Sequence, residues 1–88
     1  MKAMYALKPG VLLTETEYGM ALLDQKSAEY WTLNPTAAVV LQTLLDGHGV
    51  GRAVQALTGR YEGVDTDLAT QDVTRIIDDL RSAGLIAP

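Results

Sequence analysis

The first part of the chain alternates short apolar runs with brief polar connections. Residues 11–16, 20–24 and 28–33 form three runs rich in branched or aromatic side chains, a composition typical of β-strands. Each connection between them is only three residues long, so neighbouring strands can pair only antiparallel. The pattern therefore predicts a three-stranded antiparallel sheet.

The pattern changes at Asn34 and Pro35, which together are typical of a helix start. Asparagine is a favoured N-cap residue, and proline at the first helical position loses no hydrogen bond. The apolar residues that follow recur every three or four positions, as on one face of a helix. They are Ala37, Val40, Leu41, Leu44 and Leu45. Gly47 is suited to the left-handed conformation that ends a helix, so we expect this helix to end there.

The same spacing predicts two further helices. The second runs from Val50 to about Tyr61 and lacks a polar cap at its start. The third follows a cluster of N-cap candidates that begins at Asp65, and it ends at Gly84. Its apolar positions are Leu68, Ala69, Val73, Ile76, Ile77, Leu80 and Ala83. This apolar arc is wider than a single packing contact needs.

Three strands followed by three helices predict an α+β fold, in which the helices cover one face of the small antiparallel sheet. The 88 residues are enough for a single domain, residues 1–88, with a small core. We expect Leu85 and Ile86, which follow the third helix, to fold back onto that core.

Composition narrows the cellular setting. The chain has no cysteine, which excludes a disulfide scaffold and a thiolate metal site and is compatible with a reducing cytoplasm. No apolar run approaches the roughly 18 residues of a membrane span. Met1 and Lys2 are not followed by the hydrophobic core of a signal peptide. We therefore expect a cytoplasmic protein that does not enter a membrane.

The charge is acidic, with seven Lys and Arg against eleven Asp and Glu and a net charge of −4. Nucleic-acid binding requires a basic face, and anionic membrane surfaces attract basic helices. Residues 65–83, which include the third helix, carry five Asp and two Arg, a local balance of −3. A DNA-binding regulator is therefore disfavoured, and we expect neither a nucleic-acid nor a membrane partner.

The residues that could carry catalysis do not form a recognisable site. His48 lies between two glycines with only Asp46 near enough to orient it, and no serine has a histidine partner. No glycine-rich phosphate motif follows a strand. Asp65, Asp67 and Asp72 lack the spacing of a calcium loop and are better explained by their place near a helix start. We predict a protein without catalytic residues, metal or cofactor.

The third predicted strand, residues 28–33, is a candidate edge of the sheet. It carries one charge, Glu29, and no proline, so it is poorly protected against pairing with another chain. Tyr30 and Trp31 point to opposite faces because side chains alternate along a strand. Such an edge is suited to binding an extended peptide that adds as a further strand.

Several segments, in this order and spacing, carry a family resemblance. They are Tyr30-Trp31-Thr32-Leu33-Asn34-Pro35-Thr36-Ala37, Leu41 with Leu44-Leu45-Asp46-Gly47, Tyr61, and Asp72-Val73 with Leu80 and Gly84-Leu85-Ile86. Together they resemble the PqqD-like family, the recognition element of pathways that make ribosomally synthesised and post-translationally modified peptides (RiPPs). The resemblance covers about residues 9–86 and is nearest to the stand-alone members that serve lasso-peptide pathways.

The resemblance implies a winged helix-turn-helix-like domain without catalytic activity that binds the N-terminal leader of a precursor peptide. In the family, the leader adds as a strand beside the third strand and lies in the cleft between that strand and the third helix. Lasso leaders typically present a tyrosine, a proline and a leucine at fixed spacing. The implied partners are this leader, a separate leader peptidase and a cyclase. A PqqD-type chaperone for a radical-SAM enzyme is the alternative within the family.

Carried over onto this chain, the binding site combines the third predicted strand with one face of the third predicted helix. Its candidate residues are Ala28, Glu29, Tyr30, Trp31, Thr32, Leu33, Asp72, Val73, Arg75, Ile76, Ile77 and Leu80. The charged helix residues among them, together with Asp79, are expected to rim the apolar surface. The sequence leaves open whether Val73 or Ile77 faces the cleft.

Overall fold

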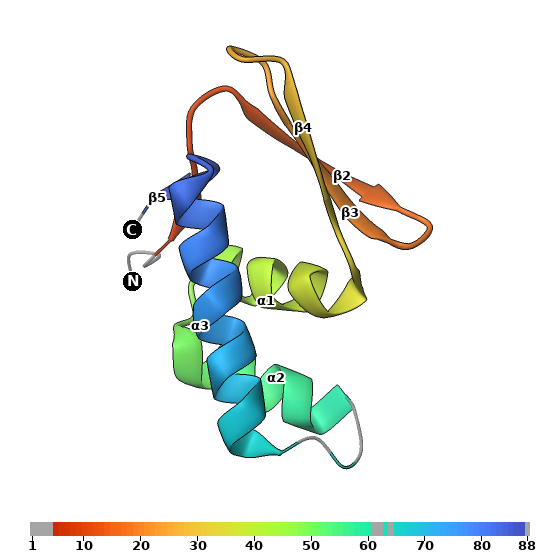
Figure 1. The fold of residues 1–88 in the computed structure, drawn as a ribbon, viewed down its shortest axis with the longest axis vertical. Helices are drawn as coiled ribbons and strands as arrows, with labels where there is room; N and C mark the ends of the chain where they lie inside the picture. Colours follow the sequence, from red (N-terminus) through yellow and green to blue (C-terminus); the bar gives the residue numbers. More distant parts are fainter. Residues whose placement is uncertain (1–4, 61–62, 64, 88) are drawn as a thin grey trace.

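The computed structural model of the chain describes residues 5–60, 63 and 65–87. It contains the predicted three-stranded antiparallel sheet followed by three helices (Figure 1). The elements are β1 (Ala6–Leu7), β2 (Val11–Thr16), β3 (Gly19–Asp24), β4 (Glu29–Leu33), α1 (Pro35–Leu45), α2 (Val50–Arg60), α3 (Thr66–Ser82) and β5 (Ile86–Ala87). The short strands β1 and β5, which form a separate two-stranded sheet, were not predicted from the sequence.

The main sheet has the order β2-β3-β4, so β4 is an edge strand. Along each strand of this sheet, successive side chains point to opposite faces, as in any pleated strand. Leu22 is paired with Trp31 and lies buried beneath the sheet, whereas Leu23 is paired with Tyr30 on the outer face, where both are exposed. The third strand begins one residue later than predicted, because Ala28 has φ of 61° and lies in the turn that precedes β4.

The helix starts follow the capping chemistry of the sequence. The Asn34 side chain accepts a hydrogen bond from the Ala37 N–H at 2.8 Å, with proline in the first turn of α1. At the start of α3, the Asp65 carboxylate accepts from the backbone N–H groups of Asp67 and Leu68. Both caps satisfy donors that a helix start leaves unpaired. Tyr61, which was expected in the second helix, lies outside the described residues.

The core joins the inner face of the sheet to all three helices. Its fully buried centre includes Leu22 of β3, Leu41 of α1 and Val73 of α3. Leu85 and Ile86 are also buried in this core, which confirms that the chain folds back after the third helix.

The end of α3 is held in place by the short second sheet. Strand β5 pairs antiparallel with β1, and the Lys8 N–H donates to the Leu85 carbonyl oxygen at 3.0 Å. Gly84, with φ of 74°, makes the turn that lets the chain reverse. The C-terminal end of α3 is thereby fixed beside the chain that leads into the main sheet.

A close backbone approach fixes the junction between β4 and α1. Gly19, with φ of 149°, opens β3 directly against the end of β4. A Cβ atom added at Gly19 would collide with the carbonyl oxygen of Leu33. Only glycine fits this position, because both the backbone conformation and the available space exclude a side chain.

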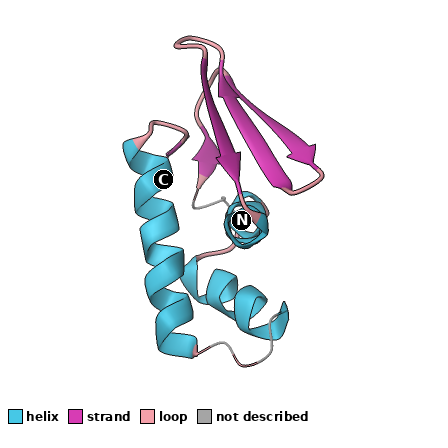
Figure 2. Cartoon of the chain, turned by 45° about the vertical axis from the view of Figure 1, so that its right-hand side comes forward, coloured by secondary structure: helices cyan, strands magenta, loops and turns pink. Residues whose placement is uncertain are grey.

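The sheet and the C-terminal half of α3 extend from α1 in different directions. Figure 2 shows α1 nearly end-on, with the sheet extending away from it in one direction and the C-terminal half of α3 in another. In Figure 1, β4 and the C-terminal end of α3 lie on different sides of the molecule, with α1 below and between them. Among the helices of the described part of the chain, none combines the length and the apolar character that crossing a membrane requires.

Candidate functional site

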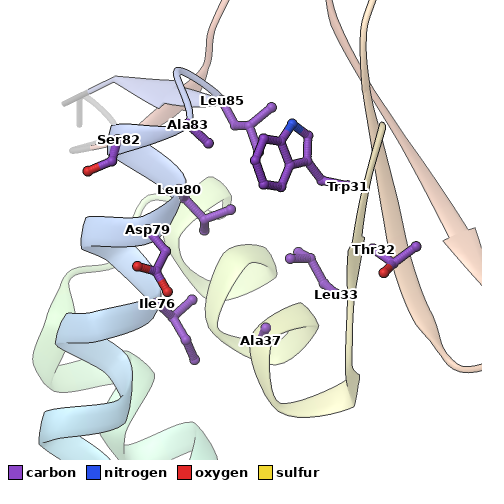
Figure 3. A pocket seen from close by; sticks show the side chains of 10 residues that line it. All are labelled: Trp31, Thr32, Leu33, Ala37, Ile76, Asp79, Leu80, Ser82, Ala83 and Leu85. Carbon is purple, nitrogen blue, oxygen red and sulfur yellow. The ribbon is translucent and has the colours of Figure 1, made fainter. Parts of the chain in front are cut away.

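A cavity of about 500 Å³ lies between β4 and the C-terminal half of α3. We call it the β4–α3 cleft. Its lining residues are Trp31, Thr32, Leu33, Ala37, Ile76, Asp79, Leu80, Ser82, Ala83 and Leu85. Figure 3 shows that Trp31, Leu33 and Leu80 point toward one open space, whereas the side chains of Thr32 and Ser82 point away from it. The structure thus places a cleft between the strand and the helix that the sequence singled out.

The β4 side of the cleft is dominated by Trp31. Its indole is 38% exposed and extends from the strand toward Leu85 and Ala83 at the end of α3 (Figure 3). Leu33 lies two residues further along β4 and therefore points to the same side. Tyr30 is on the opposite face and is 63% exposed. Of the two adjacent aromatic residues, only Trp31 lines the cleft.

The outer edge of β4 borders this cleft. Within the described residues, β4 pairs with β3 alone, from Met20↔Leu33 to Asp24↔Glu29. Alternate residues of an edge strand direct their N–H and C=O groups away from the neighbouring strand. The cleft is therefore bordered by a row of backbone donors and acceptors at a spacing that an extended peptide can match.

The α3 side of the cleft is one helical stripe. Ile76, Asp79, Leu80 and Ala83 are spaced three or four residues apart and lie on one face of the helix. The wide apolar arc of α3 thus serves two surfaces: Ile76 and Ala83 are half-buried and face the cleft, whereas Leu80 is buried in the core and also borders the cleft.

Val73 and Ile77, which the sequence placed among the candidates, lie on the core surface. They are 0% and 4% exposed and pack with the residues of α1 and α2 in the hydrophobic core. Neither lines the cleft; Ile76 does. The reason is the rotation of about 100° per residue, which turns Ile77 from the cleft toward the core when Ile76 faces the cleft.

Four other candidates lie outside the cleft lining. Ala28 is in the turn before β4, and Glu29 is exposed at the first position of that strand. Asp72 and Arg75 form an exposed ion pair on α3, with Oδ1 and a guanidinium nitrogen 3.2 Å apart. Such surface pairs contribute at most about 1 kcal/mol to stability.

Some residues that line the cleft were not predicted from the sequence. Ala37 of α1 forms the base of the cleft, and Ser82, Ala83 and Leu85 close the end near the turn that follows α3. Ala37 belongs to the predicted stripe of α1, but no sequence signal indicates that this helix also contacts the cleft. Leu85 reaches the site only because the chain reverses at Gly84.

The polar groups of the cleft are few. Asp79 is the one charged residue among those that line it. Thr32 and Ser82 also border the cleft, but their hydroxyl groups point away from the open space (Figure 3). In the described ranges, no three His, Cys, Asp or Glu residues are grouped so as to hold a metal ion. The arrangement is suited to burying apolar side chains next to a strand edge.

Comparison with known proteins identifies the family. The family model described as coenzyme PQQ synthesis protein D (PqqD) matches residues 19–86. The chain therefore belongs to the PqqD family, which confirms the resemblance found in the sequence. No curated protein sequence matches the chain.

Two solved structures have the same fold. One, described as lasso peptide synthetase B1 complexed with the leader peptide, is 42% identical, with a TM-score of 0.89 over 98% of this chain and 100% of that chain. The other, TbiB1 in complex with the TbiA(beta) leader peptide, has a TM-score of 0.82 over 91% of this chain and 92% of that chain. At 19% identity, the second likeness concerns the fold alone.

Proposed function

We propose that this protein binds the leader segment of a ribosomally synthesised precursor peptide in the β4–α3 cleft. The observation that carries the proposal is the position of the free edge of β4 directly beside an apolar cleft. The proposal is further supported by the 42% identical lasso peptide synthetase B1, which was solved with the leader peptide.

The leader binds by adding a strand to β4. Its backbone N–H and C=O groups form hydrogen bonds with the outer edge of β4, which supply affinity for many sequences. Every second side chain of the added strand points toward the helices, where Trp31, Leu33 and Ile76 offer apolar surface. The selectivity for one leader comes from these side chains rather than from the backbone pairing.

The bound segment extends beyond the strand itself. Ordering five or six peptide residues costs about 1–2 kcal/mol for each residue. Four or five backbone hydrogen bonds contribute about 0.5–1.5 kcal/mol each. Two buried apolar side chains contribute about 1.5–3 kcal/mol each. Together these contributions offset little more than the cost of ordering the peptide. Micromolar binding, about −8 kcal/mol, therefore requires contacts from further leader residues.

The protein has no catalytic role in this proposal. It presents the leader to a separate leader peptidase and a cyclase of a lasso-peptide pathway. A second candidate is a chaperone role beside a radical-SAM enzyme, which the description of the family model as coenzyme PQQ synthesis protein D favours. The two roles use the same cleft and differ in the precursor that is bound.

The test is binding of a labelled leader measured by fluorescence polarisation. The probe is the leader peptide present in the solved complex of the 42% identical synthetase. We expect micromolar or tighter binding of this leader and no binding of the leader-free core peptide. Equal binding of the two peptides would reject the proposal. Binding only of the precursor peptide of coenzyme PQQ synthesis would favour the second candidate, and salt-sensitive binding of duplex DNA would favour a regulator.

A further inference from the structure

One charged side chain lines the β4–α3 cleft. Asp79 lies on the α3 side, next to Ile76 and Leu80 (Figure 3). The other residues that line the cleft carry no charge. A peptide that enters the cleft therefore meets a carboxylate beside an otherwise apolar surface.

No cation of the described part of the chain forms an ion pair with this carboxylate. Arg75, one turn earlier on α3, pairs with Asp72 instead, at 3.2 Å. Lys8 and Arg81 line a separate hollow that includes Asp78 but not Asp79. Asp79 shares a further hollow with Arg75, but Arg75 pairs with Asp72. The negative charge in the cleft is thus left for solvent or for a bound ligand.

Helix stability does not explain an aspartate at this position. Asp79 lies in the last turn of α3, which ends at Ser82. The C-terminal end of a helix carries partial negative charge and favours a cation rather than a carboxylate. Arg81 lies in the same turn but lines a neighbouring hollow and not the cleft, so the charge that faces the cleft is the Asp79 carboxylate.

The β4 side adds no positive charge. Glu29 shares a face of β4 with Trp31 because the two residues are two positions apart, and it is paired in register with Asp24 of β3. Two carboxylates opposite each other in a sheet repel. Glu29 lies outside the cleft lining, so Asp79 supplies the one charge that lines the cleft, in a chain whose net charge is −4, and a negative field of this kind attracts a positively charged ligand.

We infer that the peptide segment bound in the cleft carries a lysine or arginine side chain that lies against the Asp79 carboxylate and the C-terminal end of α3. The aliphatic stem of this side chain packs along Ile76, and its charged head reaches the carboxylate at the rim. This inference rests on the proposed leader binding and adds a charge requirement to it.

The test is a charge scan of the leader peptide of the 42% identical synthetase complex. Each position is replaced in turn by lysine, glutamine and glutamate, and the peptides are titrated against the wild-type protein and Asp79→Asn. We expect a preference for lysine at one leader position, or at two positions that are two residues apart. There the lysine peptide should bind about two- to fivefold tighter than the glutamine peptide, which corresponds to the free energy of an exposed ion pair. Glutamate there binds more weakly than glutamine, and Asp79→Asn removes the preference.

Asp78→Asn is the matched control. It removes the same charge from the same turn of α3. Asp78 and Asp79 share one neighbouring hollow, but of the two only Asp79 lines the cleft. The preference for lysine is expected to persist in Asp78→Asn and to reverse in favour of glutamate in Asp79→Lys.

If the peptide binds but no position shows a preference that depends on Asp79, the inference is overturned while leader binding stands. If Asp78→Asn and Asp79→Asn lose the preference for lysine to the same extent, the inference is also overturned. The overall negative charge of α3 would then account for the preference without a contact to Asp79. If the wild-type protein binds no peptide of the scan, leader binding and the inference both fail.

Discussion

Trp31 of β4 and Leu80 of α3 line the same cleft from two elements that are far apart along the chain. The strand supplies an aromatic surface beside its free edge, and the helix supplies an aliphatic surface beside its C-terminal end (Figure 3). Backbone pairing and side-chain burial are therefore available to the same bound segment, and each can be tested separately.

The helix side is tested by Ile76→Glu. Ile76 is half-buried and lines the cleft, so the variant is expected to fold. It should weaken leader binding at least tenfold, because an apolar contact of about 1.5–3 kcal/mol is lost. Leader titration by fluorescence polarisation, with a thermal melt followed by circular dichroism, measures both properties.

Ile77→Glu is the control for this prediction. Ile77 is 4% exposed in the core, and an unpaired charge there costs several kcal/mol of folding stability. We expect a marked fall in the melting temperature rather than a selective loss of binding. A stable Ile77→Glu protein with weakened binding, alongside an unaffected Ile76→Glu protein, would place the binding face one residue further round the helix.

The strand side is tested by Trp31→Ala. The indole lines the cleft, and large aromatic side chains at the centre of an interface commonly contribute about 2 kcal/mol or more to binding. We expect leader affinity to fall by more than tenfold, measured by titration. Tyr30→Ala removes the neighbouring aromatic residue from the outer face and should leave affinity nearly unchanged. Similar losses in both variants would argue against a ligand confined to the cleft.

Trp31 also provides a direct signal, because it is the single tryptophan of the chain. Burial of its exposed indole by a leader should shift its emission to shorter wavelength. A leader that binds without any change in emission would have to bind elsewhere.

Strand addition makes a prediction about the peptide backbone. Successive N-methylation of leader residues should weaken binding at alternate positions only, because alternate N–H groups of an added strand point toward β4. Each affected hydrogen bond is worth about 0.5–1.5 kcal/mol, or roughly two- to twelvefold in the dissociation constant. Losses that follow a period of three or four residues would indicate a helical ligand instead.

The junction between β4 and α1 is tested by Gly19→Ala. A Cβ at this position would meet the Leu33 carbonyl group, so we expect a loss of more than about 1 kcal/mol of folding stability. For a domain of this size, the melting temperature falls by roughly 4–8 °C for each kcal/mol. Calorimetry or circular dichroism measures the shift.

Gly51→Ala is the matched control for the glycine substitution. Gly51 lies in α2, and a Cβ there would meet no atom within 4 Å. Alanine is also the better helix former, so this variant should be slightly more stable than the wild-type protein. If Gly19→Ala leaves the melting temperature unchanged, the turn between β2 and β3 can shift to accommodate the Cβ atom without a loss of folding stability.

Much of the local structure follows from the sequence by itself. The spacing of apolar residues, the Asn34-Pro35 start of α1 and the Asp65 cap of α3 each express a short-range preference, and the structure has the elements they predict. Alternation along β4 also separates Tyr30 from Trp31 before any tertiary contact is known. These features depend on neighbours within a few residues, which is why they can be read from the chain.

Only the tertiary structure decided how the surfaces of α3 are used. Its apolar arc offered Val73, Ile76, Ile77 and Leu80 without indicating which of them faces the core. That choice depends on the rotation of the helix against α1 and α2, on the reversal at Gly84 and on the short β1–β5 pairing. These are long-range packing relations between elements, and the periodicity of a single helix contains no information about its partners.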